Sequence, residues 1–105
     1  MAPRICIVTG ASGYVGEACA RRLKSRGFQV REAGRSAPPG SPERFILGEL
    51  AAPALFDSAA ALVHCAYDFK AAAPNEIERI NVRGSVDLFA AARAAGVPRL
   101  IFISS

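Results

Sequence analysis

Three glycines that follow an apolar run constrain this 105-residue chain more than any other feature. The apolar residues 4–8 stop at a segment spaced G-x-x-G-x-x-G, with Gly10, Gly13 and Gly16. A strand that turns sharply into a helix points backbone N–H groups and the positive end of the helix dipole at one place. Gly10 suits the tight turn, Gly13 lets a phosphate approach the backbone, and Gly16 lets the helix pack closely on the sheet. An ordinary glycine-rich turn is the alternative, but the flanking strand and helix favour a phosphate site.

Hydrophobic periodicity predicts alternating strands and helices around this loop. Strands are expected at residues 4–8, 28–33, 45–47, 61–66 and 99–103. Helical segments are expected at residues 14–26, 53–58 and 75–95. The last helix is expected to begin with Asn75 as its N-cap and to end at Gly96, and residues 34–44 form a breaker-rich loop. Because parallel crossovers are right-handed, the prediction is one α/β domain with a doubly wound parallel sheet of strand order 3-2-1-4-5.

Four segments of the chain follow one another in a recognisable order. They read T-G-x-x-G-x-x-G at residues 9–16, L-V-H-C-A at 62–66, N-V-R-G-S at 81–85 and R-L-I-F-I-S-S at 99–105. The segments resemble the cofactor loop, the strand beneath the nicotinamide ribose, the N-V-x-G-T helix and the catalytic strand of the extended short-chain dehydrogenase/reductases, the NAD(P)-dependent epimerase/dehydratase family. The resemblance implies a Rossmann-type fold and hydride transfer on a hydroxyl or carbonyl of a small-molecule substrate such as a nucleotide sugar.

The loop and the resemblance together predict a set of cofactor-binding residues. Glu49 and Leu50 stand where the family usually has Asp-Leu, whose acid contacts the adenine amino group. Tyr67 stands where the family often has alanine, and so could narrow the pocket. The full set is Thr9, Gly10, Ser12, Gly13, Tyr14, Val15, Gly16, Arg35, Ser36, Glu49, Leu50, Cys65, Ala66, Tyr67 and Asn81.

The end of the strand at residues 28–33 predicts which nicotinamide cofactor is preferred. Sites for NAD place an acid about 20 residues after the glycines, to hold the ribose 2′-hydroxyl, whereas sites for NADP have an arginine. Here Gly34 takes the place of the acid, and Arg35 and Ser36 follow it. A guanidinium beside a hydroxyl suits a phosphate, so NADP(H) is the expected cofactor. The alternative is that Arg35 is a plain loop residue and Glu32 turns inward as the acid.

The resemblance also implies a catalytic serine and a Y-x-x-x-K pair. Ser105 matches the serine position, although another register places that serine just past the chain end. Neither Tyr14 nor Tyr67 has a lysine four residues later. The chain is therefore expected to be an N-terminal part that lacks the substrate-binding region and turnover of its own. The alternative is a non-catalytic module that senses NADP(H).

The single histidine, one asparagine expected in mid-helix and the cysteines each admit two interpretations. His64 lies within an apolar strand, so a core imidazole is favoured over a catalytic one. Asn81 in mid-helix could hold a backbone carbonyl or a water near the active site, or be a plain polar residue. Cys6, Cys19 and Cys65 have neither C-x-x-C spacing nor a histidine partner, which favours small apolar fillers over disulfides or a metal site. A reducing compartment, the cytoplasm, is the expected location.

Charge and hydropathy exclude two classes of partner. The formal net charge is +4, but the arginines are scattered and no aromatic residues are interleaved with them, which favours a solvated surface over a nucleic-acid interface. The chain has no run of 18 apolar residues, and Met1-Ala2-Pro3-Arg4 leads straight into a strand, so neither a membrane span nor a secretory leader is expected.

The helix expected at residues 75–95 has two apolar faces. The face expected to cover the core comprises Ile77, Ile80, Gly84, Leu88, Ala91 and Ala95. A second stripe comprises Val82, Val86 and Phe89. In the resembled family this helix forms half of a four-helix dimer interface. The second stripe is therefore either a homodimer contact or a surface covered by C-terminal segments.

Overall fold

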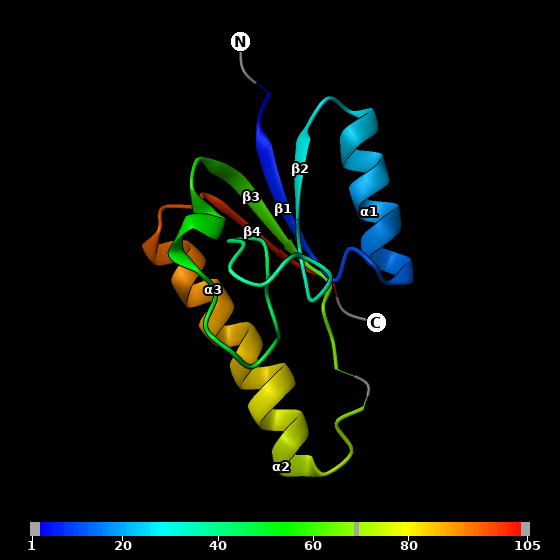
Figure 1. The fold of residues 1–105 in the computed structure, drawn as a ribbon, viewed down its shortest axis with the longest axis vertical. Coiled ribbons are helices and arrows are strands. Elements are labelled where there is room, and N and C mark those ends of the chain that lie inside the picture. The colour runs from blue at the N-terminus through cyan, green and yellow to red at the C-terminus, as the bar shows by residue number, and fades with distance from the viewer. Residues whose placement is uncertain (1–2, 69, 104–105) are drawn as a thin grey trace.

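A parallel sheet with helices on both faces forms the fold (Figure 1). The structure is a computed structural model that describes residues 3–68 and 70–103. Within these residues the sheet has four strands, β1 (Ile5–Thr9), β2 (Gln29–Ala33), β3 (Ala59–His64) and β4 (Arg99–Phe102). Their order is β2-β1-β3-β4 and every pairing is parallel. The doubly wound α/β fold predicted from the sequence is confirmed.

Successive side chains of each strand point to opposite faces of the sheet, so the core has two layers, one on each face. Val8 of β1 and Val63 of β3 pack with Ala20 of α1 (Tyr14–Ser25) on one face. Ile7 and Leu62, their neighbours in the chain, pack on the other face. That second layer also receives buried residues of η1 (Pro53–Phe56), a 3₁₀ turn, and of α3 (Gly84–Ala94). Figure 1 shows α1 and α3 on opposite sides of the sheet.

The prediction of a strand at residues 45–47 is wrong, although the predicted position of this segment beside β2 is correct. Gly34 and Arg44 form an isolated parallel bridge, and the Phe45 N–H donates to the Gly34 carbonyl at 3.1 Å. The chain then turns, because Gly48 has φ +95° and the Glu49 N–H donates to the Ile46 carbonyl. This turn ends the pairing before a strand can form. The other four predicted strands have the predicted order.

The helix predicted at residues 75–95 is present but begins differently. Ala73, not Asn75, is the N-cap, and Pro74 takes the first helical position, where its missing N–H costs nothing. The helix runs through α2 (Pro74–Glu76), the π-helical η2 (Ile77–Arg83) and α3. It ends before Gly96, whose φ is +88°, as predicted. No helix in residues 3–68 and 70–103 is long and apolar enough to cross a membrane.

The inward face of this helix differs in part from the prediction. Leu88 and Ala92 are buried in the core layer beneath the sheet, whereas Ala95 is exposed. Phe89, expected in the second stripe, packs against the core and meets the His64 ring edge-on at 5.5 Å between centroids. The π-helical segment adds residues to its turns, so the phase of the helix changes relative to a uniform 3.6-residue period.

Candidate functional site

A cleft lies along the edge of the sheet where the parallel strands have their carboxyl ends. One hollow of about 400 Å³ reaches from the glycine loop toward the end of β2. A second, of about 580 Å³, reaches from the same loop toward the end of β4. Open parallel sheets bind ligands at this edge. The two hollows, which together we call the cleft, share a wall formed by Gly10, Gly13, Cys65, Ala66 and Tyr67.

The glycine loop can form only with glycine at two of its three positions. Gly10 has φ +70°, and a Cβ on it would lie 2.8 Å from the backbone nitrogen of Ala66. A Cβ on Gly16 would overlap the Gly10 carbonyl oxygen, so α1 could not pack so closely on the loop. Gly13 is the N-cap of α1 and no side chain caps that helix end. The first N–H groups of α1 therefore face the cleft without a side-chain acceptor, as an anion site requires.

Thr9 connects the glycine loop to β3 and, through His64, to α3. Its hydroxyl oxygen accepts the N–H groups of Cys65 at 3.0 Å and Ala66 at 3.3 Å. Because both acceptor sites are used, the hydroxyl proton is donated to His64 Nδ1, 2.6 Å away. His64 Nε2 then carries the ring proton and donates to Ser85 Oγ at 2.7 Å. The imidazole is fully buried with both nitrogens bonded, so the prediction of a core histidine is confirmed.

Acidification is expected to destabilise the fold through His64. Burial lowers the pKa of His64 from 6.5 to about 4, so the folded state holds the ring neutral while the unfolded state takes up a proton as the pH falls. The stabilisation is present above pH 6.5 and is lost as the pH falls toward 4. Linkage gives a loss of about 2 kcal/mol between pH 7 and pH 5. Urea unfolding followed by circular dichroism at the two pH values measures it.

The chain has one histidine, so a proton NMR titration of the imidazole provides an unambiguous control. A midpoint near pH 4 is expected. In His64→Asn, the difference in unfolding free energy between pH 7 and pH 5 should largely vanish. A histidine midpoint near 6.5 in the folded protein would contradict the buried, neutral assignment.

The end of β2 presents a cation to the cleft and turns its carboxylate away. Arg35 lines the hollow near β2. Glu32 instead lies 3.5 Å from Lys24 of α1, with about half of each side chain exposed. A Cβ on Gly34 would meet no atom within 4 Å. Ser36 is exposed and is not among the residues that line the cleft.

Glu49, predicted to contact the adenine, and its neighbour Leu50 lie outside the cleft. Glu49 is exposed, Leu50 is 94% exposed, and neither lines the hollows. Buried Phe45 and Leu47 form that wall instead. Ser105, the predicted catalytic serine, lies outside the described residues.

The remaining loop residues line the cleft on its two sides. Ser12 borders the hollow near β2. Tyr14, which is 93% exposed, and Val15 border the hollow near β4. Cys65 lies on the shared wall, where burial and then the adjacent Cys19 thiol raise its pKa to about 11. Cys65 is thus a protonated wall residue at neutral pH rather than a nucleophile.

Asn81 acts at a distance from the cleft by holding the backbone of Asp68. Asn81 is 5% exposed and lies in the π-helical η2. Its Oδ1 accepts the Asp68 N–H at 2.7 Å, and its Nδ2 donates to the Asp68 carbonyl at 3.2 Å. The predicted contact with a backbone carbonyl is present. The sequence alone assigned no role to Ser85 or Lys70. Ser85 bonds to His64, and Lys70 lines the cleft.

Comparison with known proteins identifies relatives of this chain. Residues 6–105 match the sequence profile of the NAD dependent epimerase/dehydratase family. A 2-alkyl-3-oxoalkanoate reductase of Stenotrophomonas maltophilia strain K279a is 34% identical over 109 residues, covering 94% of this chain and 32% of the relative. This chain therefore spans about a third of the length of that curated relative.

Solved structures show the same fold. A short-chain dehydrogenase/reductase superfamily protein of Agrobacterium tumefaciens with bound NAD superposes with a TM-score of 0.77 and 30% identity, over 97% of this chain and 33% of that chain. A uronate dehydrogenase of the same organism superposes with a TM-score of 0.75 and 31% identity, over 100% of this chain and 42% of that chain.

Proposed function

Because the chain belongs to the NAD dependent epimerase/dehydratase family, we propose that it is the cofactor-binding part of an epimerase, dehydratase or reductase that prefers NADP(H) to NAD(H). The observation that carries the proposal is the cleft above Gly10, Gly13 and Gly16, where backbone N–H groups and missing Cβ atoms leave room for a pyrophosphate. The bound nicotinamide would accept or supply hydride. The residues of this chain bind and orient the dinucleotide.

The chemistry at the end of β2 supports the preference for NADP(H). Arg35 lines the hollow where the adenosine ribose would lie, and no carboxylate takes the position of Gly34. Glu32 does not line the cleft, and its carboxylate lies 3.5 Å from the Lys24 ammonium instead. A guanidinium can form charge-assisted hydrogen bonds with a 2′-phosphate, whereas NAD(H) offers it only a hydroxyl.

The substrate proposed is a small molecule with a hydroxyl or carbonyl group, such as a nucleotide sugar. The relatives include a uronate dehydrogenase and a 2-alkyl-3-oxoalkanoate reductase, which supports this breadth of substrates. We also propose a cytoplasmic location and a homodimer formed through residues 75–95. Val82 and Val86 support the dimer, because more than half of each side chain is exposed on that helix.

Arg35→Ala is expected to weaken NADPH binding about 10- to 100-fold and to leave NADH binding within about twofold. The lost contact is a charge-assisted hydrogen bond to the 2′-phosphate, which contributes about 1.5–3 kcal/mol. Titration of nicotinamide fluorescence measures both affinities, and the chain has no tryptophan to interfere.

Arg93→Ala is the matched control, because Arg93 is exposed on α3 and does not line the cleft. Both affinities should be unchanged in it. Wild-type protein that binds neither dinucleotide would refute the proposed function. Equal affinity for NADH and NADPH would refute only the preference.

A further inference from the structure

Two of the three cysteines meet at the wall of the cleft. Cys65 lies directly after β3 and lines both hollows of the cleft. Cys19 lies on α1, and its thiol is in hydrogen-bond contact with the thiol of Cys65. Both residues are partly exposed, whereas Cys6 is buried in β1. The expectation that the cysteines are apolar fillers therefore fits Cys6, but it does not explain the contact between the other two.

The packing of α1 on the sheet brings the two thiols together. Steps of three and four residues, which mark one face of a helix, join Gly16, Cys19, Ala20 and Leu23. Gly16 and Ala20 are buried, so this face is the one that lies on the sheet. Ala20, Leu23 and Cys65 belong to the same core layer. Cys19 therefore reaches the end of β3 from the helix above it.

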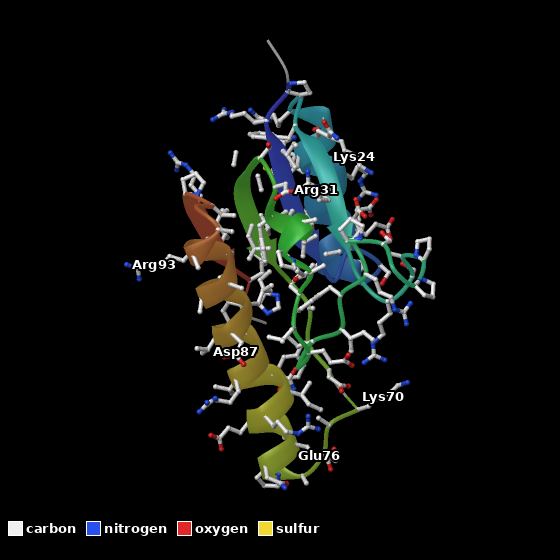
Figure 2. All side chains as sticks on the ribbon, turned by 60° about the vertical axis from the view of Figure 1, so that its left-hand side comes forward. Lys24, Arg31, Lys70, Glu76, Asp87 and Arg93 are labelled. Carbon is white, nitrogen blue, oxygen red and sulfur yellow. The ribbon has the colours of Figure 1, made fainter. Side chains whose placement is uncertain are left out.

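Cys19 lies in the half of α1 that is nearer the cleft. The helix begins at Tyr14, beside the glycine loop, and Lys24 lies in its last turn. Lys24 is near the end of the molecule opposite to Glu76 (Figure 2). Cys19 comes only three residues after Gly16. A covalent change at Cys19 therefore acts on the start of the helix, where the phosphate site is expected.

Backbone contacts leave the glycine loop little room to follow a movement of either cysteine. A Cβ on Gly16 would overlap the Gly10 carbonyl oxygen, and a Cβ on Gly10 would lie 2.8 Å from the Ala66 nitrogen. The Cys65 N–H donates to the Thr9 carbonyl and to the Thr9 hydroxyl. A covalent bond holds two sulfur atoms closer than a contact between thiols does. Closing such a bond draws α1 and the end of β3 together and distorts the loop between them.

We propose that Cys19 and Cys65 form a redox modification site, at which a peroxide closes a disulfide bond that lowers the affinity of the cleft for its dinucleotide. The effect on the dinucleotide rests on the proposed function, whereas the formation of the disulfide does not. In a reducing compartment such a disulfide is transient, as in proteins that sense oxidants.

The reaction consumes one hydrogen peroxide for each disulfide. Burial raises the pKa of Cys65 to about 11, so that thiol stays protonated and Cys19 is the sulfur that attacks the peroxide. The O–O bond breaks, a sulfenic acid forms on Cys19, and the first water leaves. Cys65 then attacks the sulfenic sulfur, the S–S bond forms, and the hydroxyl leaves as a second water with the Cys65 proton. The two sulfurs lose two electrons in total, and the peroxide gains them.

Hydrogen peroxide is expected to reduce the number of free thiols from three to one and to weaken NADPH binding about tenfold or more. A thiol-reactive dye counts the thiols, mass spectrometry of the digest identifies the cross-link, and nicotinamide fluorescence measures the affinity. Dithiothreitol should reverse both changes. Cys19→Ser should bind like the reduced wild type and lose the response to peroxide.

Cys6→Ala is the matched control, because it removes a cysteine of the core and keeps the pair. Its affinity should respond to peroxide as that of the wild type does. Any cross-link formed in this variant joins Cys19 to Cys65, since no other cysteine remains. In Cys65→Ser, a dimedone probe should trap the sulfenic acid on Cys19. Labelling of Cys65 in Cys19→Ser instead would refute the order of the two steps.

The linkage between the two equilibria provides an independent readout. Because the disulfide weakens dinucleotide binding, a bound dinucleotide must favour the dithiol form by the same factor. For a tenfold effect, saturating NADP⁺ raises the reduction potential of the pair by about 30 mV. A titration of Cys6→Ala in a glutathione redox buffer, with and without NADP⁺, measures this shift.

Two results would overturn the proposal. One is that peroxide leaves three free thiols in the wild type or gives no cross-link between Cys19 and Cys65. The other is a disulfide that changes neither the affinity nor the reduction potential, which would separate the cysteine pair from the cleft. Reduced wild type that binds no dinucleotide refutes the proposed function instead, and the thiol count and the cross-link then still decide whether the disulfide forms.

Discussion

Gly34→Asp is expected to shift the ratio of NADPH to NADH affinity by about 100-fold in favour of NADH. The new carboxylate would accept hydrogen bonds from the ribose 2′-hydroxyl of NADH and repel the 2′-phosphate of NADPH. Each effect is worth about 1.4 kcal/mol or more, and together they give the stated ratio. Fluorescence titrations of the variant and the wild type with both dinucleotides measure it.

The backbone at Gly34 can accept the substitution. Its φ lies outside the left-handed region, and a Cβ there would have no atom within 4 Å. The Gly34 N–H donates to the Glu43 carbonyl and its carbonyl accepts the Phe45 N–H, and neither bond involves a side chain of residue 34. Gly34→Asn is the matched control, since it adds the same bulk without charge and should largely keep the wild-type preference. An unchanged ratio in Gly34→Asp would show that the ribose does not lie beside this residue.

The parts of the fold that could be predicted from sequence are those set by strong local signals. A β-branched strand that breaks into glycines, and a helix stopped by Gly96, have little conformational choice. The order of β2, β1, β3 and β4 then follows from right-handed crossovers. The resemblance placed most of the cleft residues for the same reason, because they belong to contiguous motifs.

The features that were mispredicted depend on competition between tertiary contacts. Residues 45–47 have strand composition, but the turn at Gly48 ends their pairing after one bridge. Asn75 is a good capping residue, yet the N-cap is Ala73, two positions earlier, and Pro74 starts the helix. The π-helical η2 leaves no simple periodic signal, and it is the segment that buries Asn81.

The bonding around His64 and Lys70 lay beyond sequence reasoning because it joins distant residues. Thr9 and His64 are 55 positions apart, and His64 and Ser85 are 21 apart. Lys70 has no motif of its own, and its N–H donates to Asp68, whose N–H is bonded to Asn81, 13 positions along the chain. Pairings of this kind become visible only once the strands and helices have been assembled. The serine in N-V-R-G-S was the one available signal for Ser85.

Gly16→Ala is expected to lower the free energy of unfolding by about 2–3 kcal/mol. The added methyl would overlap the Gly10 carbonyl oxygen and lie 3.0 Å from the Ala11 Cα, and these are backbone atoms that cannot rotate away. Overpacking of this kind typically costs about 1–3 kcal/mol. Helix propensity alone gives the opposite sign, since alanine is favoured over glycine in a helix by about 1 kcal/mol. Urea unfolding followed by circular dichroism therefore separates the two effects by sign.

Gly13→Ala is the matched variant, because it adds the same methyl three residues earlier and separates stability from binding. A Cβ on Gly13 would meet only the Gly10 carbonyl oxygen, at 3.3 Å, so the unfolding free energy should fall by no more than about 1 kcal/mol. The methyl would nevertheless point toward the cleft that Gly13 lines, where a phosphate needs to approach the backbone. Dinucleotide affinity is thus expected to fall in Gly13→Ala although the fold persists. A Gly16→Ala variant that is more stable than the wild type would contradict the close contact of α1 with the loop. Undiminished dinucleotide binding by Gly13→Ala would show that the phosphate does not lie next to Gly13.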